Sequence, residues 1–459
     1  MAGALEKNVL AVDIGAGSGR FILGTFRNGD LRLAETGRFV HRDCRVNGLI
    51  YWNLPEIYNH VLEGIRKATE IAGHLDGVGF DTFAPDFACF TDAGLLAGNI
   101  LSYRNFQGPG PLEPMLAQLS TDDFWEICGN EPLAFSWLPQ LLHLQSLGLF
   151  APSAGITPLP LGNALAYLLS GVRHTDWTQV SISMMSDRRL KNWSPELIER
   201  FIRPPFHLPD MLPCGNVLDN MRVNGALADT AVINVGSHDT ACANGFLALR
   251  SGAELVVNAG TWISVGTVCD EPVVNRAMMD HALNNYGLPD GRTLVCRLSI
   301  GMGLIRTLYG CMVEEGYAPD YATLGSLASS SDYDQYFDVH DPDLFATDRP
   351  FPRVVADILA REDKPAPDGF LDVVRSVYLS LAENIAAVGD ALEQSTRRRF
   401  SSVYIGGGGV QDAFFLSLVQ ARTGLKIVKM PSESTAIGNV RTQLVALGID
   451  PGRLAFQGG

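Results

Sequence analysis

Two aspartates stand where an apolar run gives way to small residues, which is a place where a carboxylate can do chemistry. Asp13 ends one such run and precedes the turn Gly15-Ala-Gly-Ser-Gly-Arg20, and Asp239 follows the run 231–236 within Ser237-His-Asp-Thr240. A carboxylate so placed can hold a metal ion, accept a proton as a general base, or cap a helix. Each position alone has a structural explanation, because Asp13 could be solvated beside an ordinary hairpin and Asp239 could be a helix cap.

The glycine turn after Asp13 predicts a phosphate cradle inside an antiparallel meander. Residues 20–26 have the alternation of a strand, and Asn28-Gly-Asp30 is a hairpin signal before the next run, 31–36. A dinucleotide-binding turn would instead lead into a helix, and Arg20 here occupies the place of its third glycine. The order of strand, glycine turn and strand is typical of ATP-binding domains of the actin/hexokinase type.

A second turn of this kind and a run of four glycines lie in the later part of the chain. Residues 254–268 repeat the order strand, turn and strand, with Gly260-Thr261 in the turn, which predicts an internal duplication divided near residue 230. The strand 402–406 runs into Gly406-Gly-Gly-Gly409 and then into a helix, so its backbone can approach a flat ligand closely. A flexible tether is the alternative, but patterned segments flank the glycines on both sides.

Composition and charge exclude several classes of function. The chain has 459 residues, of which 46% are hydrophobic and 19% charged, and this predicts two or three compact domains. Its formal charge of −15 argues against nucleic-acid binding. We find neither an apolar run long enough for a membrane span nor a signal-peptide pattern, so we expect a cytoplasmic protein without a membrane partner. The eight cysteines form no C-x-x-C pair, so we expect free thiols and no zinc site.

Taken together, the motifs supply the parts needed for ATP-dependent phosphoryl transfer. They comprise a carboxylate for a metal ion, a base, two phosphate cradles and a platform for a purine. Two phosphate-sized turns that face each other would suit a nucleotide held between two similar α/β halves. The expected cofactors are therefore ATP and Mg²⁺.

With these motifs the sequence resembles the FGGY family of carbohydrate kinases, and within it the branch of L-rhamnulose and L-fuculose kinases. The turn after Asp13 is similar to the first phosphate motif of the family, Gly260-Thr-Trp262 to the second, and Gly406–Gln411 to the adenosine motif, while Ser237-His-Asp-Thr240 is similar to the catalytic segment. Four other stretches also fall where that branch has comparable sequences, namely Tyr51-Trp-Asn-Leu54, Asp81-Thr-Phe-Ala-Pro-Asp86, Ser102-Tyr-Arg-Asn105 and Ser434-Thr-Ala-Ile-Gly-Asn439. The resemblance implies an α/β fold in which two ribonuclease-H-like domains of the actin/hexokinase type, residues 1–230 and 231–459, flank a central cleft.

The resemblance also implies roles for individual residues. Asp239 is expected to be the catalytic base that accepts the proton of a sugar hydroxyl, and Asp13 is expected to hold Mg²⁺, directly or through water. The expected sugar-binding residues are Thr82, Phe83, Asp86, Arg104 and His238. The expected ATP-binding residues are Gly15, Ala16, Gly17, Arg20, Gly260, Thr261, Gly303, Gly407, Gly408 and Gln411.

Two of these side chains have a structural alternative, and a third residue, Trp262, is expected to be structural. His238 could be a core histidine satisfied by the backbone, and Arg104 could pair with a carboxylate instead of reaching the sugar. Trp262 is expected in the core and not as a stacking surface.

The chain departs from the family pattern on the sugar side, which leaves the acceptor open. Ala84-Pro85 replaces Gly-Val, Asn53 and Asn105 stand where Asp is common, and residues 296–303 lack an Asn expected near the nucleotide. The expected acceptor is a 6-deoxyketohexose such as L-rhamnulose or L-fuculose. A kinase of a pentulose, polyol or other sugar derivative is the alternative, as is a non-catalytic actin-like sugar sensor. The expected partners are a small-molecule sugar and ATP, and a homodimer is one oligomeric state that the sequence allows.

Overall fold

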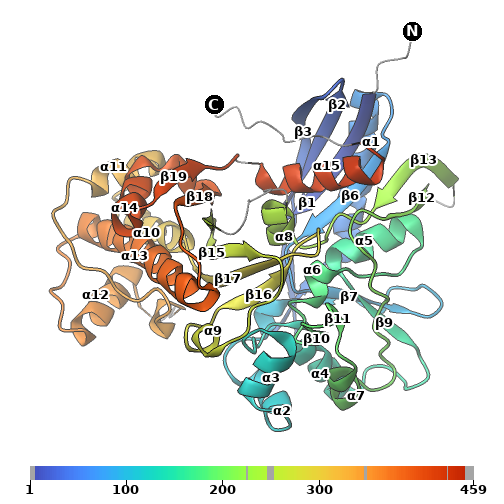
Figure 1. Ribbon diagram of the computed structural model, residues 1–459, viewed down its shortest axis with the longest axis horizontal. Helices are drawn as coiled ribbons and strands as arrows, with labels where there is room; N and C mark the ends of the chain where they lie inside the picture. The colour runs from blue at the N-terminus through green and yellow to red at the C-terminus, as the bar shows by residue number, and fades with distance from the viewer. Residues whose placement is uncertain (1–5, 224–225, 246–252, 346–348, 432, 450–459) are drawn as a thin grey trace.

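The computed structural model describes residues 6–223, 226–245, 253–345, 349–431 and 433–449, and its main feature is a pair of related six-stranded sheets (Figure 1). The first sheet has the order β12 (Val217–Val223), β13 (Ala226–Ile233), β6 (Gly77–Thr82), β1 (Glu6–Ile14), β2 (Ser18–Arg27) and β3 (Asp30–Val40). The second has the order β16 (Asn284–Gly287), β17 (Thr293–Ile300), β15 (Trp262–Cys269), β14 (Glu254–Ala259), β18 (Ser402–Gly406) and β19 (Lys426–Lys429).

The two sheets share one pairing pattern. In the first, β1 pairs antiparallel with β2 and parallel with β6, and β6 in turn pairs parallel with β13. In the second, β14 pairs antiparallel with β15 and parallel with β18, and β18 pairs parallel with β19. This repeat confirms the predicted α/β fold with two similar halves.

Helices cover both faces of each sheet. Leu10 and Val12 of β1 face a cluster that includes α1 (Leu54–Ala72) and α5 (Leu161–Ser170), whereas Val9 and Ala11 face α15 (Ser434–Ala446). A strand buried on both faces must be apolar at successive positions, which explains the unbroken apolar run in β1. On the second sheet, Val257 packs with α13 (Phe370–Thr396) on one face.

Helices α8 (Asp239–Gly245) and α15 lie between the two sheets (Figure 1). The two helices pack against each other, and α15 also packs against β1 and β6. Ala241 of α8 and Ile437 of α15 belong to a cluster with Val256 of β14. The helix pair therefore forms the layer that both sheets share.

Smaller elements surround this framework. In the first half they are β4 (Asp43–Val46), β5 (Leu49–Trp52), β7 (Phe87–Thr91), β8 (Ile100–Leu101), β9 (Ile156–Pro160), β10 (Ser186–Asp187), β11 (Asn192–Trp193), α2 (Glu113–Leu116), α3 (Thr121–Cys128), α4 (Trp137–Leu147), α6 (Trp177–Val180) and α7 (Pro195–Phe201). In the second half they are α9 (Arg276–Asp280), α10 (Gly303–Glu314), α11 (Leu324–Ala328), α12 (Phe351–Arg361) and α14 (Ala413–Thr423). Within the described ranges, no helix is both long and apolar enough to cross a bilayer.

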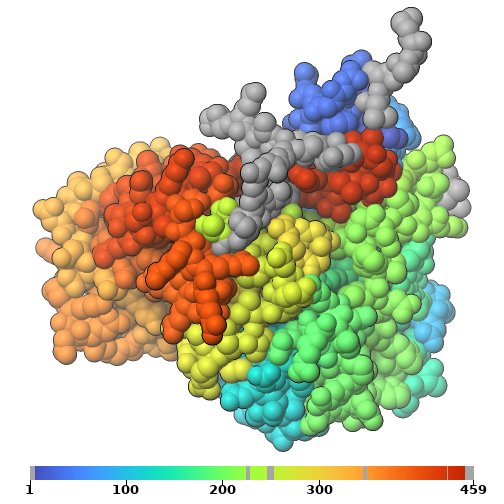
Figure 2. All heavy atoms as spheres, in the orientation of Figure 1, coloured from blue at the N-terminus to red at the C-terminus, as the bar shows by residue number. Residues whose placement is uncertain are grey.

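The halves also meet beside β16 and α9, where yellow residues of the second half abut the cyan and green surface of the first (Figure 2). Lys191 pairs with Glu271 at 3.0 Å and donates to the carbonyl oxygen of Gly291 at 3.0 Å.

The division of the chain into two domains at residue 230 stays a prediction. β13 spans that residue and belongs to the first sheet, and α15 returns from the end of the chain to the same sheet.

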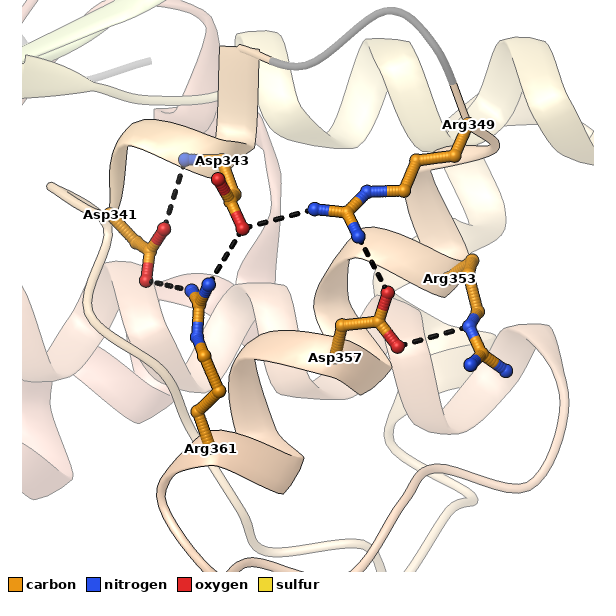
Figure 3. Close-up of polar contacts among 6 residues, drawn as sticks. All are labelled: Asp341, Asp343, Arg349, Arg353, Asp357 and Arg361. Atoms are coloured by element: carbon orange, nitrogen blue, oxygen red, sulfur yellow. Dashed lines mark hydrogen bonds and ion pairs between the residues drawn. The ribbon is translucent and has the colours of Figure 1, made fainter.

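An ion-pair network fastens the short 3₁₀ helix Pro342–Phe345 to α12 (Figure 3). Arg361 contacts Asp341 at 2.5 Å and Asp343 at 2.7 Å, while Arg349 contacts Asp343 at 3.0 Å and Asp357 at 2.8 Å. Arg353 adds a contact to Asp357 at 3.0 Å. Because these side chains are partly exposed to solvent, which screens their charges, each pair contributes little to stability. The network includes none of the predicted site residues.

Gly438 sets the close approach of α15 to α8, so its replacement should destabilise the protein. A Cβ at Gly438 would stand 2.0 Å from the carbonyl oxygen of Cys242, whereas a Cβ at Gly310 in α10 would meet no atom within 4 Å. We expect Gly438→Ala to lower the free energy of unfolding by about 1–3 kcal/mol through overpacking. Gly310→Ala should raise it by up to about 1 kcal/mol through helix propensity. Denaturant unfolding measures both, and a Gly438→Ala variant as stable as the wild type would contradict this packing.

Candidate active site

Three aspartates gather where β1 and β6 end and α8 begins. Asp13 and Asp81 are direct partners in the parallel pairing of these strands. Thr82, the next residue of β6, donates its backbone N–H to the carbonyl oxygen of Ser237 at 2.9 Å, and α8 begins with Asp239 two residues later. Because parallel strands end at the same edge of a sheet, the topology gathers residues that are far apart in the sequence.

Asp13 is a buried carboxylate held across its own hairpin. Its side chain is 9% exposed, and its Oδ2 accepts a hydrogen bond from Nη2 of Arg20 at 2.5 Å. Arg20 also pairs with Glu433, just before α15, at 2.8 Å. Burial and the charge of Asp239 raise the pKa of Asp13, and Arg20 opposes this shift. The guanidinium of Arg20 is thus already engaged by two carboxylates.

Asp81 is fully buried and was absent from the expected site residues. Its Oδ2 accepts a hydrogen bond from Nδ2 of Asn439 in α15 at 2.6 Å, while its Oδ1 is buried without a partner in the described parts of the chain. Burial, together with the charge of Asp13, raises the pKa of Asp81 well above its usual range. The available signal was its position in Asp81-Thr-Phe-Ala-Pro-Asp86, which ends the strand parallel to β1.

Asp239 has the environment of a general base. Its side chain is 32% exposed, and its Oδ1 accepts a hydrogen bond from the backbone N–H of Thr240 at 2.5 Å. Loss of surrounding water raises the pKa of Asp239 to about 6. A general base is most effective when its pKa lies near the working pH and its carboxylate is accessible to the proton donor. Asp239 combines a raised pKa with a partly exposed side chain.

The imidazole ring of His238 makes no hydrogen bond to the backbone within the described ranges, in contrast to the structural alternative of a core histidine. Its Nδ1 is buried without a hydrogen-bond partner in the described structure, and its Nε2 lies 3.6 Å from Oδ1 of Asp239. Burial lowers the pKa of His238 to about 4, so the ring is neutral at physiological pH. The ring lines a cavity of about 80 Å³ together with Thr240 and Tyr286.

Asp86 and Arg104 are engaged by neighbouring protein groups. The carboxylate of Asp86 accepts hydrogen bonds from Nε1 of Trp52 at 2.5 Å and the backbone N–H of Tyr103 at 2.9 Å, and burial raises its pKa to about 7. Arg104 pairs with Asp43 at 2.8 Å, as its structural alternative foresaw. It also lies over the Trp52 ring and donates to the carbonyl oxygen of Ala16 at 3.1 Å, so it supports the first glycine turn.

Thr82 and Phe83 are buried beside this network. Oγ1 of Thr82 donates to the carbonyl oxygen of Ser237 at 3.4 Å, and the Phe83 ring packs among Trp52, His41 and Tyr103. Phe83, Asp86 and Arg104 all contact Trp52 and so form one group in the first half, but none of them lines the cavity beside His238.

The first glycine turn leaves part of its backbone open. Gly15 donates its N–H to the carbonyl oxygen of Ser18 at 2.9 Å, and Nε2 of His41 lies 2.8 Å from the Gly15 carbonyl oxygen. Gly17 is exposed, and a Cβ placed there would meet nothing within 4 Å. The carbonyl oxygens of Ala16 and Gly17 accept hydrogen bonds from Arg104 at 3.1 Å and from the backbone N–H of His41 at 3.3 Å. The backbone N–H groups of Ala16 and Gly17 donate to no residue in the described ranges.

The second turn is held by the start of α10. Gly303 donates its N–H to the carbonyl oxygen of Thr261 at 3.2 Å, and Met302 donates to that of Gly260 at 2.9 Å. Arg306 of α10 was not among the expected residues, although it donates to Oγ1 of Thr261 at 3.1 Å. The expectation that Trp262 lies in the core is wrong, since this residue is 43% exposed beside the turn.

The glycine run contains two residues with different surroundings. Gly407 has a φ of +82°, and a Cβ there would stand 2.7 Å from the carbonyl oxygen of Ala259. At Gly408 a Cβ would meet nothing within 4 Å, and Gln411, at the end of the same 3₁₀ turn, is exposed. The backbone is therefore closely packed at Gly407 and open at Gly408.

The chain is similar to known carbohydrate kinases in both sequence and fold. Residues 255–447 match the C-terminal domain of the FGGY family of carbohydrate kinases. A rhamnulokinase of Bacteroides thetaiotaomicron is 26% identical over 454 residues, which cover 97% of this chain and 92% of the relative.

Solved structures share the fold at low sequence identity. A ligand-bound xylulose kinase from Lactobacillus acidophilus superposes with a TM-score of 0.78 at 15% identity, over 96% of this chain and 90% of the other. Glycerol kinase from Plasmodium falciparum, solved with ADP, has a TM-score of 0.77 at 13% identity, with coverage of 96% and 90%. These likenesses confirm the actin/hexokinase-type fold.

The charge on Asp239 should cost stability, because its surroundings favour the protonated form. The folded pKa of about 6 lies above the ordinary 3.8, so the cost is complete above pH 6 and vanishes as the pH falls toward 4. We therefore expect Asp239→Asn to raise the Tm at pH 8 and to lose this advantage near pH 4. Thermal melting across this range tests it, with the exposed Asp332→Asn as the control that leaves Tm unchanged. A lower Tm for Asp239→Asn at pH 8 would contradict the assignment.

Proposed function

Because the chain is a carbohydrate kinase of the FGGY family, we propose that it transfers the γ-phosphoryl group of ATP to a hydroxyl of a ketose, with a 6-deoxyketohexose such as L-rhamnulose or L-fuculose as acceptor. The observation that carries this proposal is the environment of Asp239. Its carboxylate, with a pKa of about 6, stands at the start of α8 beside His238 and the cavity that His238 lines. The similarity to a rhamnulokinase over nearly the whole chain supports the sugar class.

Asp239 would accept the proton of the sugar hydroxyl as its oxygen attacks the γ-phosphorus. The O–H bond breaks as the new P–O bond forms, and the bond to the leaving ADP oxygen breaks in line. Asp239 is partly exposed, and its hydrogen bonds within the described ranges both reach Oδ1, from the backbone N–H of Thr240 at 2.5 Å and from its hydroxyl at 3.1 Å. Oδ2 is therefore available to the incoming proton. A positioned base contributes roughly 10²–10⁴-fold to such a reaction.

The glycine turns would hold ATP. The exposed residues of the two turns, Gly17 and Thr261, would face the phosphates, where backbone N–H groups can stabilise negative charge. Gly303 would hold the second turn in position through its hydrogen bond to Thr261. The open backbone at Gly408 and the exposed Gln411 would lie against the adenosine.

Asp13 suits a magnesium ion. Its carboxylate offers oxygen donors, and burial together with the charge of Asp239 raises its pKa, a shift that a nearby cation would oppose. No group of three or more His, Cys, Asp or Glu side chains arranged for a metal occurs among the described residues. This fits Mg²⁺, which keeps several waters and binds through one or two carboxylates plus substrate phosphates. When bound, the ion would neutralise charge on the phosphates, and Asp13 would hold it directly or through water.

The raised pKa and the position of Asp239 argue for a catalyst and against a non-catalytic sensor, which would need no base. Other acceptors on the same fold remain the alternative, because the sugar-side segment of this chain contains Ala84-Pro85 and Asn53.

A coupled assay of ADP release tests the proposal across 6-deoxyketohexoses, ketohexoses, pentuloses and polyols. We expect the highest kcat/KM with a 6-deoxyketohexose. Asp239→Asn should lower kcat with saturating sugar by at least about 10²-fold, because it removes a positioned base. It should leave ATP binding intact by calorimetry. Near-wild-type turnover of this variant would contradict the base assignment, and preference for a pentulose or polyol would replace the proposed acceptor.

Substitutions in the glycine run should separate nucleotide contact from folding. At Gly408 the valine side chain finds open space in the protein but would occupy the place proposed for the adenosine, so the KM for ATP should rise far more than that for sugar. Gly407→Val should instead lower the Tm, because its side chain would meet the carbonyl oxygen of Ala259. Equal changes in both KM values for a folded Gly408→Val variant would argue against an adenosine site here.

A further inference from the structure

The cavity beside His238 is built from both halves of the chain. Its lining includes Phe135 and Met184 from the first half and Asn284 and Leu298 from the second sheet, with Glu131 and His238 among its polar walls. It therefore presents apolar surface and ionisable side chains to one small space. Its position next to Thr240 places it beside the base assigned above.

Glu131 is held in this cavity by its backbone. Its N–H donates to Oδ1 of Asn284 in β16 at 2.9 Å. The preceding residue, Asn130, donates from Nδ2 to the carbonyl oxygen of Ser181 at 2.6 Å and accepts from the backbone N–H of Asn285 at 2.5 Å. These bonds hold the loop against both halves, so the backbone of Glu131 is fixed at the wall of the cavity.

The carboxylate of Glu131, in contrast, makes no hydrogen bond or ion pair with any described residue. It is only partly exposed, and burial raises its pKa while the more distant Arg297 opposes the shift. A carboxylate removed from much of its water and left without a partner in the protein carries a cost in free energy, which a ligand that donates hydrogen bonds would relieve.

His238 presents a second unsatisfied group on the same cavity. Its Nδ1 is buried without a partner in the described structure, and its low pKa keeps the ring neutral. A carboxylate only accepts hydrogen bonds, whereas a neutral imidazole nitrogen can donate or accept, depending on its tautomer. A ligand rich in hydroxyl groups satisfies both, because each hydroxyl donates one hydrogen bond and accepts others.

We infer that Glu131 is a specificity-determining residue for the acceptor sugar, and that its carboxylate accepts hydrogen bonds from sugar hydroxyls in the cavity whose other polar wall is His238. This inference rests on the proposed function and deepens it. The carboxylate also repels anions, so sugars that carry a carboxylate or phosphate group at this end are excluded. Phe135, Met184 and Leu298 supply the apolar surface for a carbon of the sugar that lacks a hydroxyl.

Substitution of Glu131 tests the inference by separating sugar affinity from ATP affinity. Loss of a hydrogen bond to a charged group lowers affinity by about tenfold or more. Glu131→Ala should therefore raise the KM for the best sugar of the panel at least about tenfold, and the KM for ATP should change less than about twofold. Calorimetry with sugar alone should give the same loss of affinity. Glu131→Gln, which keeps an acceptor but loses the charge, should bind the neutral sugar with intermediate affinity and should admit sugar acids better than the wild type.

Glu199→Gln is the matched control, because Glu199 is an exposed residue of α7 in the same half and should leave both KM values unchanged. Wild-type affinity for sugar in a folded Glu131→Ala variant would overturn the role of Glu131 alone. A wild-type protein that neither binds nor phosphorylates any sugar of the panel would overturn the proposed function, and this inference with it.

Discussion

The close crossing of α8 and α15 is the contact on which the candidate site depends. The two helices come from parts of the chain about two hundred residues apart, and both lie in the layer between the sheets. Gly438 allows the backbones to approach to a distance that no side chain would permit. Because α8 begins with Asp239 and α15 carries Asn439, the same crossing positions the proposed base and the group that fixes Asp81. The contact between α8 and α15 therefore determines both the packing of this layer and the positions of Asp239 and Asn439.

That interface concentrates negative charge in a place where water is scarce. Asp13, Asp81 and Asp239 all have raised pKa values, and each charge makes the next one harder to form. Such a cluster lowers stability, but under the proposed function its charge would attract a cation and its raised pKa values would suit a base that takes up a proton near neutral pH. Arg20 offsets only part of this repulsion, since it also pairs with Glu433.

Local sequence patterns predicted the central strands and turns of both sheets. The apolar run before Asp13, the glycine turn and the alternation after it predicted β1 and β2, and the repeat at 254–268 predicted β14 and β15. The start of a helix at Asp239 was also predicted. These features depend on neighbours within a few residues, which is the range over which backbone preferences and periodicity act.

Local sequence patterns could not predict the features that depend on contacts between residues far apart in the sequence. Asp81 stood in a quoted sugar-side segment but was left out of the expected site residues, because its pairing with Asp13 and its hydrogen bond from Asn439 arise only in the folded chain. Glu131 was missed because only the folded chain brings it to the cavity that contains His238. Gly407 and Gly408 look alike in sequence, yet only the first lies against Ala259. Trp262 was misplaced because its size favours the core, whereas its position at a hairpin turn leaves it exposed.

A crystal structure with a 6-deoxyketohexose and a non-hydrolysable ATP analogue tests the central claim most directly. The account predicts one sugar hydroxyl within about 2.6–3.2 Å of the Asp239 carboxylate and in line with the γ-phosphorus. It also predicts that the rest of the sugar lies between Glu131 and His238. A complex in which the sugar hydroxyl nearest the γ-phosphorus faces a different side chain, with Asp239 turned toward solvent, would contradict the account.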